Sequence, residues 1–103
     1  MNWPVIMDLG EQSTERLARV FHALGHSTRL AIAFRLRQGE LCVTQLTTTL
    51  GGSQSNMSAH LSLLHGAGVL GRRREENRIY YALANDRVRM IIQWLASQHR
   101  LSP

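Results

Sequence analysis

The sequence predicts a single, mainly α-helical (α+β) domain of about five helices, with one two-stranded β-hairpin near the C-terminal end. Its 103 residues, 44% of them hydrophobic, are enough for one domain with a modest core. Apolar residues recur at helical spacing along most of the chain, whereas residues 78–83 alternate between apolar and polar side chains as a half-buried strand does. No apolar run reaches the roughly 18 residues of a membrane helix, and no signal peptide is visible. We therefore expect a cytoplasmic protein without membrane contacts.

The charge of the chain narrows the class of partner. Twelve basic residues against seven acidic ones give a net charge of +5, and every basic residue is Arg. The planar fork of Arg binds phosphate or guanine bidentately, although a biased genome composition would also explain the absence of Lys. A small basic domain fits nucleic acid or an anionic membrane surface.

The N-terminal third predicts two helices. Residues 1–10 show no period, so we expect an N-terminal arm or a short extra helix there. Apolar spacing predicts a first helix over 11–24 and a second helix that ends at about Gln38. Either Ser27 or Thr28 is expected to cap the second helix.

The middle of the chain predicts a helix-turn-helix. A third helix is expected over 41–50, followed by a turn at residues 51–52 and a fourth helix over 54–66. Ser53 stands where an N-cap is needed. The apolar stripe of the fourth helix, at i, i+4 and i+7, consists of Met57, Leu61 and Leu64.

The opposite side of this fourth helix is polar but carries no acidic residue. Its members are Gln54, Ser55, Ser58, Ser62 and His65. A helix that only needed solubility would more often carry Glu and Lys. Short amides and hydroxyls suit base edges in a DNA major groove, so this segment is the candidate recognition helix.

A β-hairpin is predicted after the recognition helix. Its strands are expected over 68–74 and 78–83, with a three-residue tip that includes Asn77, a residue that tolerates left-handed backbone. Four Arg residues flank the tip: Arg72, Arg73, Arg74 and Arg78. Such a wing can bind phosphate or enter a minor groove, although a merely solvated strand edge is the alternative.

The last predicted helix runs from about residue 85 to 99 and is followed by a tail at 100–103. Its apolar residues are Val88, Ile91, Ile92 and Leu95, with Trp94 beside them. This is more apolar surface than a terminal helix of a small domain needs. We expect a subunit interface, and a two-fold dimer is the commonest assembly.

Taken together, three strings resemble the ArsR/SmtB family of winged helix-turn-helix repressors. They are residues 24–30 (LGHSTRL), 40–46 (ELCVTQL) and 53–61 (SQSNMSAHL), and the strand 78–83 is similar to the second wing strand of that family. The resemblance covers roughly residues 11–95. It implies a homodimeric transcriptional repressor that binds an imperfect palindrome in an operator.

The resemblance also implies residue roles. The first and last helices would form the dimer interface, which adds Leu17 and Val20 to the apolar residues of the last helix. Gln54, Ser55 and Ser58 match base-contacting positions. The DNA-contacting set expected on this segment is Ser53, Gln54, Ser55, Asn56, Ser58 and His60.

The metal ligands that this resemblance leads one to expect are mostly missing. Residues 40–43 look like the start of the metal box of the family, but Thr44 stands where a second Cys belongs. On the last helix, Asn85 and Arg87 align with ligand positions, and an Arg opposes a cation. One thiolate cannot form a soft-metal site, so we expect no cofactor and no conventional metal. Cys42 is either a small buried hydrophobe or a redox or persulfide sensor, and the inducer is an unknown small molecule or redox signal.

The leading function is therefore sequence-specific DNA binding as a repressor. The first alternative is a metal- or thiol-responsive repressor that uses Cys42 or His residues. The second is a winged-helix protein-interaction module that does not read DNA, which would favour acidic or large apolar groups on the outer face of residues 54–65. We expect no enzyme, because no catalytic triad pattern or phosphate-binding Gly loop is present.

Overall fold

The computed structural model describes residues 10–98 and shows a mainly α winged helix-turn-helix domain with five α-helices, as predicted. Residues 1–9 and 99–103, which include most of the expected arm and the tail, lie outside the described residues. In chain order the elements are α1 (Gly10–Leu24), α2 (Ser27–Arg35), the 3-10 turn η2 (Leu36–Gln38), β1 (Leu41–Cys42), α3 (Val43–Leu50), α4 (Gln54–Gly66), β2 (Leu70–Glu75), β3 (Arg78–Leu83) and α5 (Asp86–Gln98).

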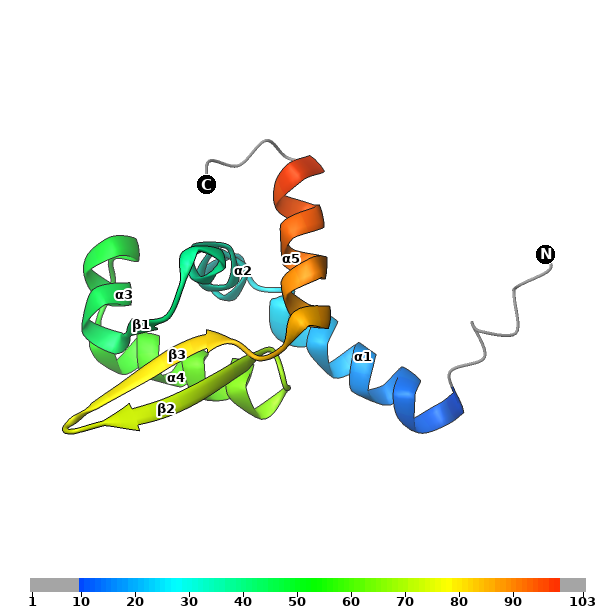
Figure 1. Ribbon diagram of the computed structural model, residues 1–103, viewed down its shortest axis with the longest axis horizontal. Coiled ribbons are helices and arrows are strands. Elements are labelled where there is room, and N and C mark those ends of the chain that lie inside the picture. Colours follow the sequence, from blue (N-terminus) through cyan, green and yellow to red (C-terminus); the bar gives the residue numbers. More distant parts are fainter. Residues whose placement is uncertain (1–9, 99–103) are drawn as a thin grey trace.

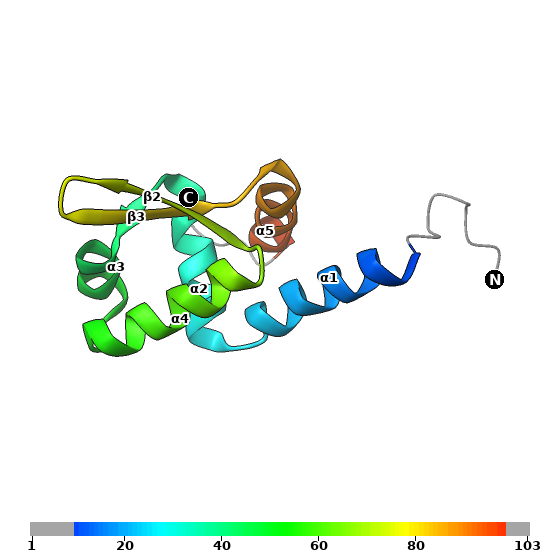
Figure 2. The same cartoon turned by 90° about the horizontal axis from the view of Figure 1, so that it is seen from below.

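The hydrophobic core lies between the helices and one face of the β2–β3 hairpin, and α1 extends away from this body (Figures 1 and 2). The largest fully buried side chains come from α2, η2, α3, α4, the segment that leads into β2, β2 itself and α5: Ile32, Leu36, Leu46, Leu61, Leu64, Val69, Leu70 and Ile92. Burying one such side chain contributes about 1.5–3 kcal/mol, so this shared core fixes α4 relative to the hairpin.

The sheet has three strands, and the prediction of two strands was wrong. Its order is β1-β3-β2, with all pairs antiparallel. Leu41 pairs with Tyr81 and Cys42 with Tyr80, so these two residues are extended instead of starting the third helix. The backbone groups of β1 bond to the free edge of β3, and this tertiary pairing overrides the local apolar spacing.

The tip of the hairpin is also shorter than predicted. Glu75 pairs with Arg78 and belongs to β2, which leaves only Glu76 and Asn77 in the turn. Glu76, rather than Asn77, has the positive φ of 55°. A two-residue hairpin turn requires positive φ at its first central position, which explains why Glu76 takes it.

The helix caps differ in how well the sequence predicted them. The Ser53 Oγ accepts a hydrogen bond from the Asn56 N–H at 3.1 Å, which confirms Ser53 as the N-cap of α4. The cap of α2 is instead His26, whose Nδ1 accepts from the Thr28 N–H at 3.1 Å. Ser27 or Thr28 was the wrong choice because His26 is the last extended residue before the helix.

Candidate nucleic-acid interface

The turn between α3 and α4 is built on two glycines. Gly51 and Gly52 both have φ near +86°, a region that disfavours any residue with a side chain. The Gly51 N–H still donates to the Thr47 carbonyl at 2.7 Å and closes α3. The turn therefore delivers the chain directly to the Ser53 cap, where α4 begins.

The two sides of α4 have opposite surroundings. Met57, Leu61 and Leu64 are buried in the core, as the predicted stripe requires. The first turn and the side facing away from the core are exposed; the exposed residues of the predicted DNA-contacting set are Ser53, Gln54, Ser55, Asn56 and Ser58. The start of α4 thus presents exposed polar side chains, and none of them is acidic.

His60, the sixth member of that set, is only partly exposed. Its ring lies 4.8 Å from the ring of His26, and its Nδ1 is 3.4 Å from Nη1 of Arg29. Arg29 in turn donates from Nε to the Ala23 carbonyl at 2.6 Å. Burial, followed by the charges of His26 and Arg29, lowers the pKa of His60. This side chain connects α4 to the corner between α1 and α2.

Thr44 is a polar neighbour of the α4 surface that sequence reasoning did not select. Gln54 Nε2 lies 3.4 Å from Thr44 Oγ1, so the side chain of Gln54 bridges the two helices of the helix-turn-helix. Ten residues separate the pair in the chain. No local pattern links them, and only the crossing of α3 over α4 brings them together.

The arginines of the hairpin alternate between its two faces. Arg72 lies opposite Tyr81 and Arg74 opposite Ile79, on the face that carries the buried Leu70. Arg73 lies opposite Tyr80 on the outer face. Arg72, Arg73, Arg74 and Arg78 are all exposed, as expected for a wing.

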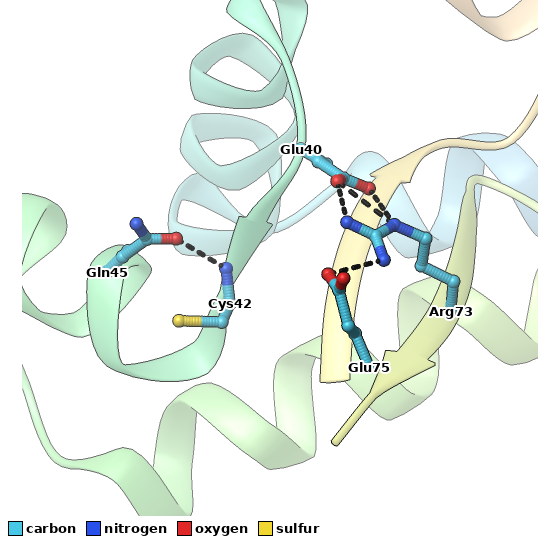
Figure 3. A network of polar contacts seen from close by, with 5 residues as sticks. All are labelled: Glu40, Cys42, Gln45, Arg73 and Glu75. Carbon is cyan, nitrogen blue, oxygen red and sulfur yellow. Dashed lines mark hydrogen bonds and ion pairs between the residues drawn. The ribbon is translucent and has the colours of Figure 1, made fainter. Parts of the chain in front are cut away.

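Arg73 is held in an ion-pair network that no other wing arginine shares among the described residues (Figure 3). Glu40 accepts two hydrogen bonds from Nε, at 2.8 and 3.0 Å, and one from Nη2. Glu75 accepts from Nη1 at 3.0 Å, and the guanidinium lies 4.7 Å from the centre of the Tyr80 ring. The bond from Arg73 lowers the pKa of Glu40, and the two carboxylates raise the pKa of Arg73.

Cys42 is buried and serves as the N-cap of α3. Its N–H donates to Gln45 Oε1 at 3.0 Å, and its side chain accepts from the Gln45 N–H, a reciprocal capping box. Figure 3 shows the sulfur pointing away from the Arg73 network. Within residues 10–98 no group of three or more His, Cys, Asp or Glu side chains could hold a metal ion.

The predicted dimer residues divide by exposure. Val88 and Ile92 lie in the core of the protomer, and Val20, Ile91 and Leu95 are partly buried. Leu17 and Trp94 are exposed, at 38% and 62%. Met90, for which the sequence also favours an interface role, and Phe21, which the prediction of the interface omitted, are exposed too. The large exposed apolar side chains on α1 and α5 are Leu17, Phe21, Met90 and Trp94.

The chain is similar in sequence to known bacterial regulatory proteins. The family described as bacterial regulatory proteins of the arsR family matches residues 26–70. The cadmium resistance transcriptional regulatory protein CadC homolog of Staphylococcus aureus is 36% identical over 87 residues, covering 84% of this chain and 72% of that protein. The transcriptional activator HlyU of Vibrio cholerae is 31% identical over 98 residues, covering 95% and 88%.

Solved structures agree with the sequence matches. A structure of HlyU from Vibrio cholerae has a TM-score of 0.81 at 29% identity and covers 86% of this chain and 97% of that one. The homodimeric winged helix-turn-helix DNA-binding domain of a possible ArsR-family transcriptional regulator from Mycobacterium bovis has a TM-score of 0.76 at 35% identity, covering 84% and 82%. Among residues 10–98, none of the helices combines the length and the apolarity needed to span a bilayer.

Proposed function

Because the chain belongs to the arsR family of bacterial regulatory proteins, we propose that it acts as a homodimeric repressor on a palindromic operator, with α4 in the major groove. Members of this family are winged-helix, DNA-binding transcriptional regulators and not enzymes. The direction of control, the operator and the residue roles are parts of the proposal.

The observation that carries the proposal is the outer surface of α4. Gln54, Ser55 and Ser58 are exposed, uncharged and free of bulk, and the helix is fixed from behind by three buried apolar side chains. Amides and hydroxyls donate to and accept from base edges, whereas acidic side chains there would be repelled by phosphates. We assign base contacts to these three residues. Ser53 and Asn56, at the start of the helix, would lie beside the DNA backbone.

The hairpin supplies backbone contacts in this proposal. Arg72, Arg74 and Arg78 are exposed and form no ion pair among the described residues, so they are available to phosphates or a minor groove. Arg73 has two carboxylates around it. We assign it the role of holding the wing against the segment that carries Glu40, rather than the DNA contact expected from the sequence.

The exposed apolar residues of α1 and α5 support the homodimer. A similar domain from Mycobacterium bovis is homodimeric. We propose that residues 11–99 form one DNA-binding and dimerisation domain, flanked by an arm at 1–10 and a tail at 100–103. In a two-fold dimer the two α4 helices would meet half-sites about one helical turn, roughly 34–36 Å, apart.

Salt titration of DNA binding tests the proposal. Binding to a promoter-sized palindromic duplex should lose affinity steeply with salt, while a marked preference over a scrambled duplex of equal length persists. Binding that ignores sequence at every salt concentration would refute the repressor assignment and favour a protein-interaction module.

The inducer is best sought outside conventional metals. Operator binding should be measured with and without Zn²⁺, arsenite, an oxidant and a persulfide, in the natural protein and in Cys42→Ser. Since Cys42 caps α3 from a buried position, we expect none of these to release the DNA. Release that is lost in Cys42→Ser would establish a thiol-responsive repressor instead.

A further inference from the structure

A cavity of about 350 Å³ lies where α1, the C-terminal end of α4 and the start of α5 meet. The cavity is separate from the surface proposed to face DNA. It lies at the C-terminal end of α4, whereas that surface lies at the N-terminal end. Val20, Val88 and Ile91 supply apolar lining, and Arg16, Arg19 and Arg87 also line the cavity. A volume of this size is within the range of small-molecule sites in proteins.

The positive charge of the arginines around this cavity is not balanced by any acidic residue in its lining. Arg16 and Arg19 are three residues apart and so share one face of α1, while Arg87 comes from α5. None of the lining residues is acidic, and none of the three arginines forms an ion pair among the side chains of residues 13–98. By contrast, Arg73 has two carboxylate partners within the same structure. The three arginines therefore give the rim of the cavity a positive charge that no lining residue balances, which favours a ligand of negative charge.

We propose that this cavity binds a small organic anion with an apolar body, such as a carboxylate or sulfonate on an aliphatic or aromatic group. The apolar lining would bury the body of the ligand, which is favourable in proportion to the area removed from water. An arginine fork would bind the acidic group bidentately through hydrogen bonds between two charged groups, which are stronger than those to a neutral acceptor.

The position of the cavity gives such a ligand a means of control. Leu17 and Ile91 line it and belong to the proposed dimer face, and the turn at residues 66–68 connects it to the end of α4. A ligand there touches both the element that would read DNA and the elements that would set the dimer. This regulatory consequence rests on the proposed function, whereas binding of the anion does not.

The experiment uses two fluorescent probes that differ in charge, with the full chain and no DNA. Anilinonaphthalene sulfonate carries an apolar body and an anionic group, and N-phenylnaphthylamine is its neutral analogue. Both are titrated into the natural protein, into Arg87→Gln and into Arg89→Gln. Arg89 is the matched control, because it lies on the same helix but does not line the cavity.

The sulfonate should bind saturably at one molecule per chain, about tenfold more weakly to Arg87→Gln than to Arg89→Gln, with the neutral probe insensitive to both changes. Octanoate should displace the sulfonate, and octanol should not. If Arg87→Gln melts at a lower temperature than the natural protein, Arg16→Gln replaces it. Equal affinity of both variants for the sulfonate, or no saturable binding, overturns the proposal. If the sulfonate binds as expected but the protein binds no operator, the proposed function is refuted and the anion site stands.

Discussion

Arg73 and Arg74 are adjacent and chemically identical, yet strand alternation gives them different surroundings. Arg74 faces Ile79 and has no acidic partner among the described residues, whereas Arg73 is bound by Glu40 and Glu75. A guanidinium that is already neutralised gains little from a phosphate, because it must first leave its carboxylates. Composition alone could not separate the two, since Glu40 lies 33 positions away in the chain.

Substitution of these two arginines should therefore have different effects on DNA binding. Arg74→Ala should lower affinity for all sequences and reduce the salt slope by about one phosphate contact. Arg73→Ala should leave the salt slope nearly unchanged, because Arg73 binds Glu40 instead of a phosphate. Loss of this solvent-exposed ion pair should also cost little stability. Fluorescence anisotropy across a salt series measures both slopes. Equal slopes for the two variants would contradict the roles assigned here.

His60 gives the fold a dependence on pH. Burial, His26 and Arg29 lower its pKa from the ordinary value of 6.5, so the unfolded chain binds a proton more tightly than the folded one. The stability is therefore complete above about pH 6.5 and falls as the pH decreases from 6.5 through the lowered pKa. Urea unfolding of His60→Gln at pH 7.5 and pH 5 should show a smaller difference than the natural protein. His22→Gln, a change at an exposed residue, is the control and should retain the full difference.

At the level of elements, the sequence predicts the bounds of a helix correctly where these bounds depend on residues close together in the chain. The α4 bounds follow from the Ser53 cap and an apolar stripe, and both depend on residues within a few positions. The start of α3 could not be predicted in the same way, because Leu41 and Cys42 are held by an edge of β3 that lies about 40 residues later. Among the site residues, the exposed face of α4 was readable from periodicity. The position of His60 was not, since His26 and Arg29 come from another part of the chain.

The Ser53 cap offers a way to separate the stability of α4 from its function. Ser53→Ala should lower the free energy of unfolding by about 1 kcal/mol, because the Asn56 N–H loses its acceptor. Ser53→Asp should keep the stability, since Asp is as good a cap as Ser. It should nevertheless weaken DNA binding strongly, because its carboxylate would face phosphates. Chemical denaturation and operator titration of both variants measure the two effects. Normal operator affinity in Ser53→Asp would move the start of α4 away from the DNA.

At the level of the whole molecule, the apolar residues left exposed are the strongest sign of an assembly. Leu17 and Phe21 on α1, and Met90 and Trp94 on α5, are large side chains that the protomer does not bury. Figures 1 and 2 show α1 extending away from the body of the domain, so most of its surface is open to a partner. Burying a Trp side chain at an interface centre commonly contributes 2 kcal/mol or more to association, which is about a 30-fold change in the dissociation constant.

Weakening this surface should therefore separate the subunits and, with them, operator binding. Trp94→Gln should raise the dimer dissociation constant by about 30-fold or more, as measured by sedimentation velocity over a dilution series. Leu50→Gln is the matched control, because Leu50 is also an exposed apolar residue, at 36%, but lies on α3, away from α1 and α5. At protein concentrations where Trp94→Gln is monomeric, one α4 reaches only one half-site, so binding should fall to the level of a duplex with a single half-site. Raising the protein concentration should restore both the dimer and full affinity. If Trp94→Gln remains dimeric at every dilution, the subunits meet elsewhere and the assignment of α5 to the interface is wrong.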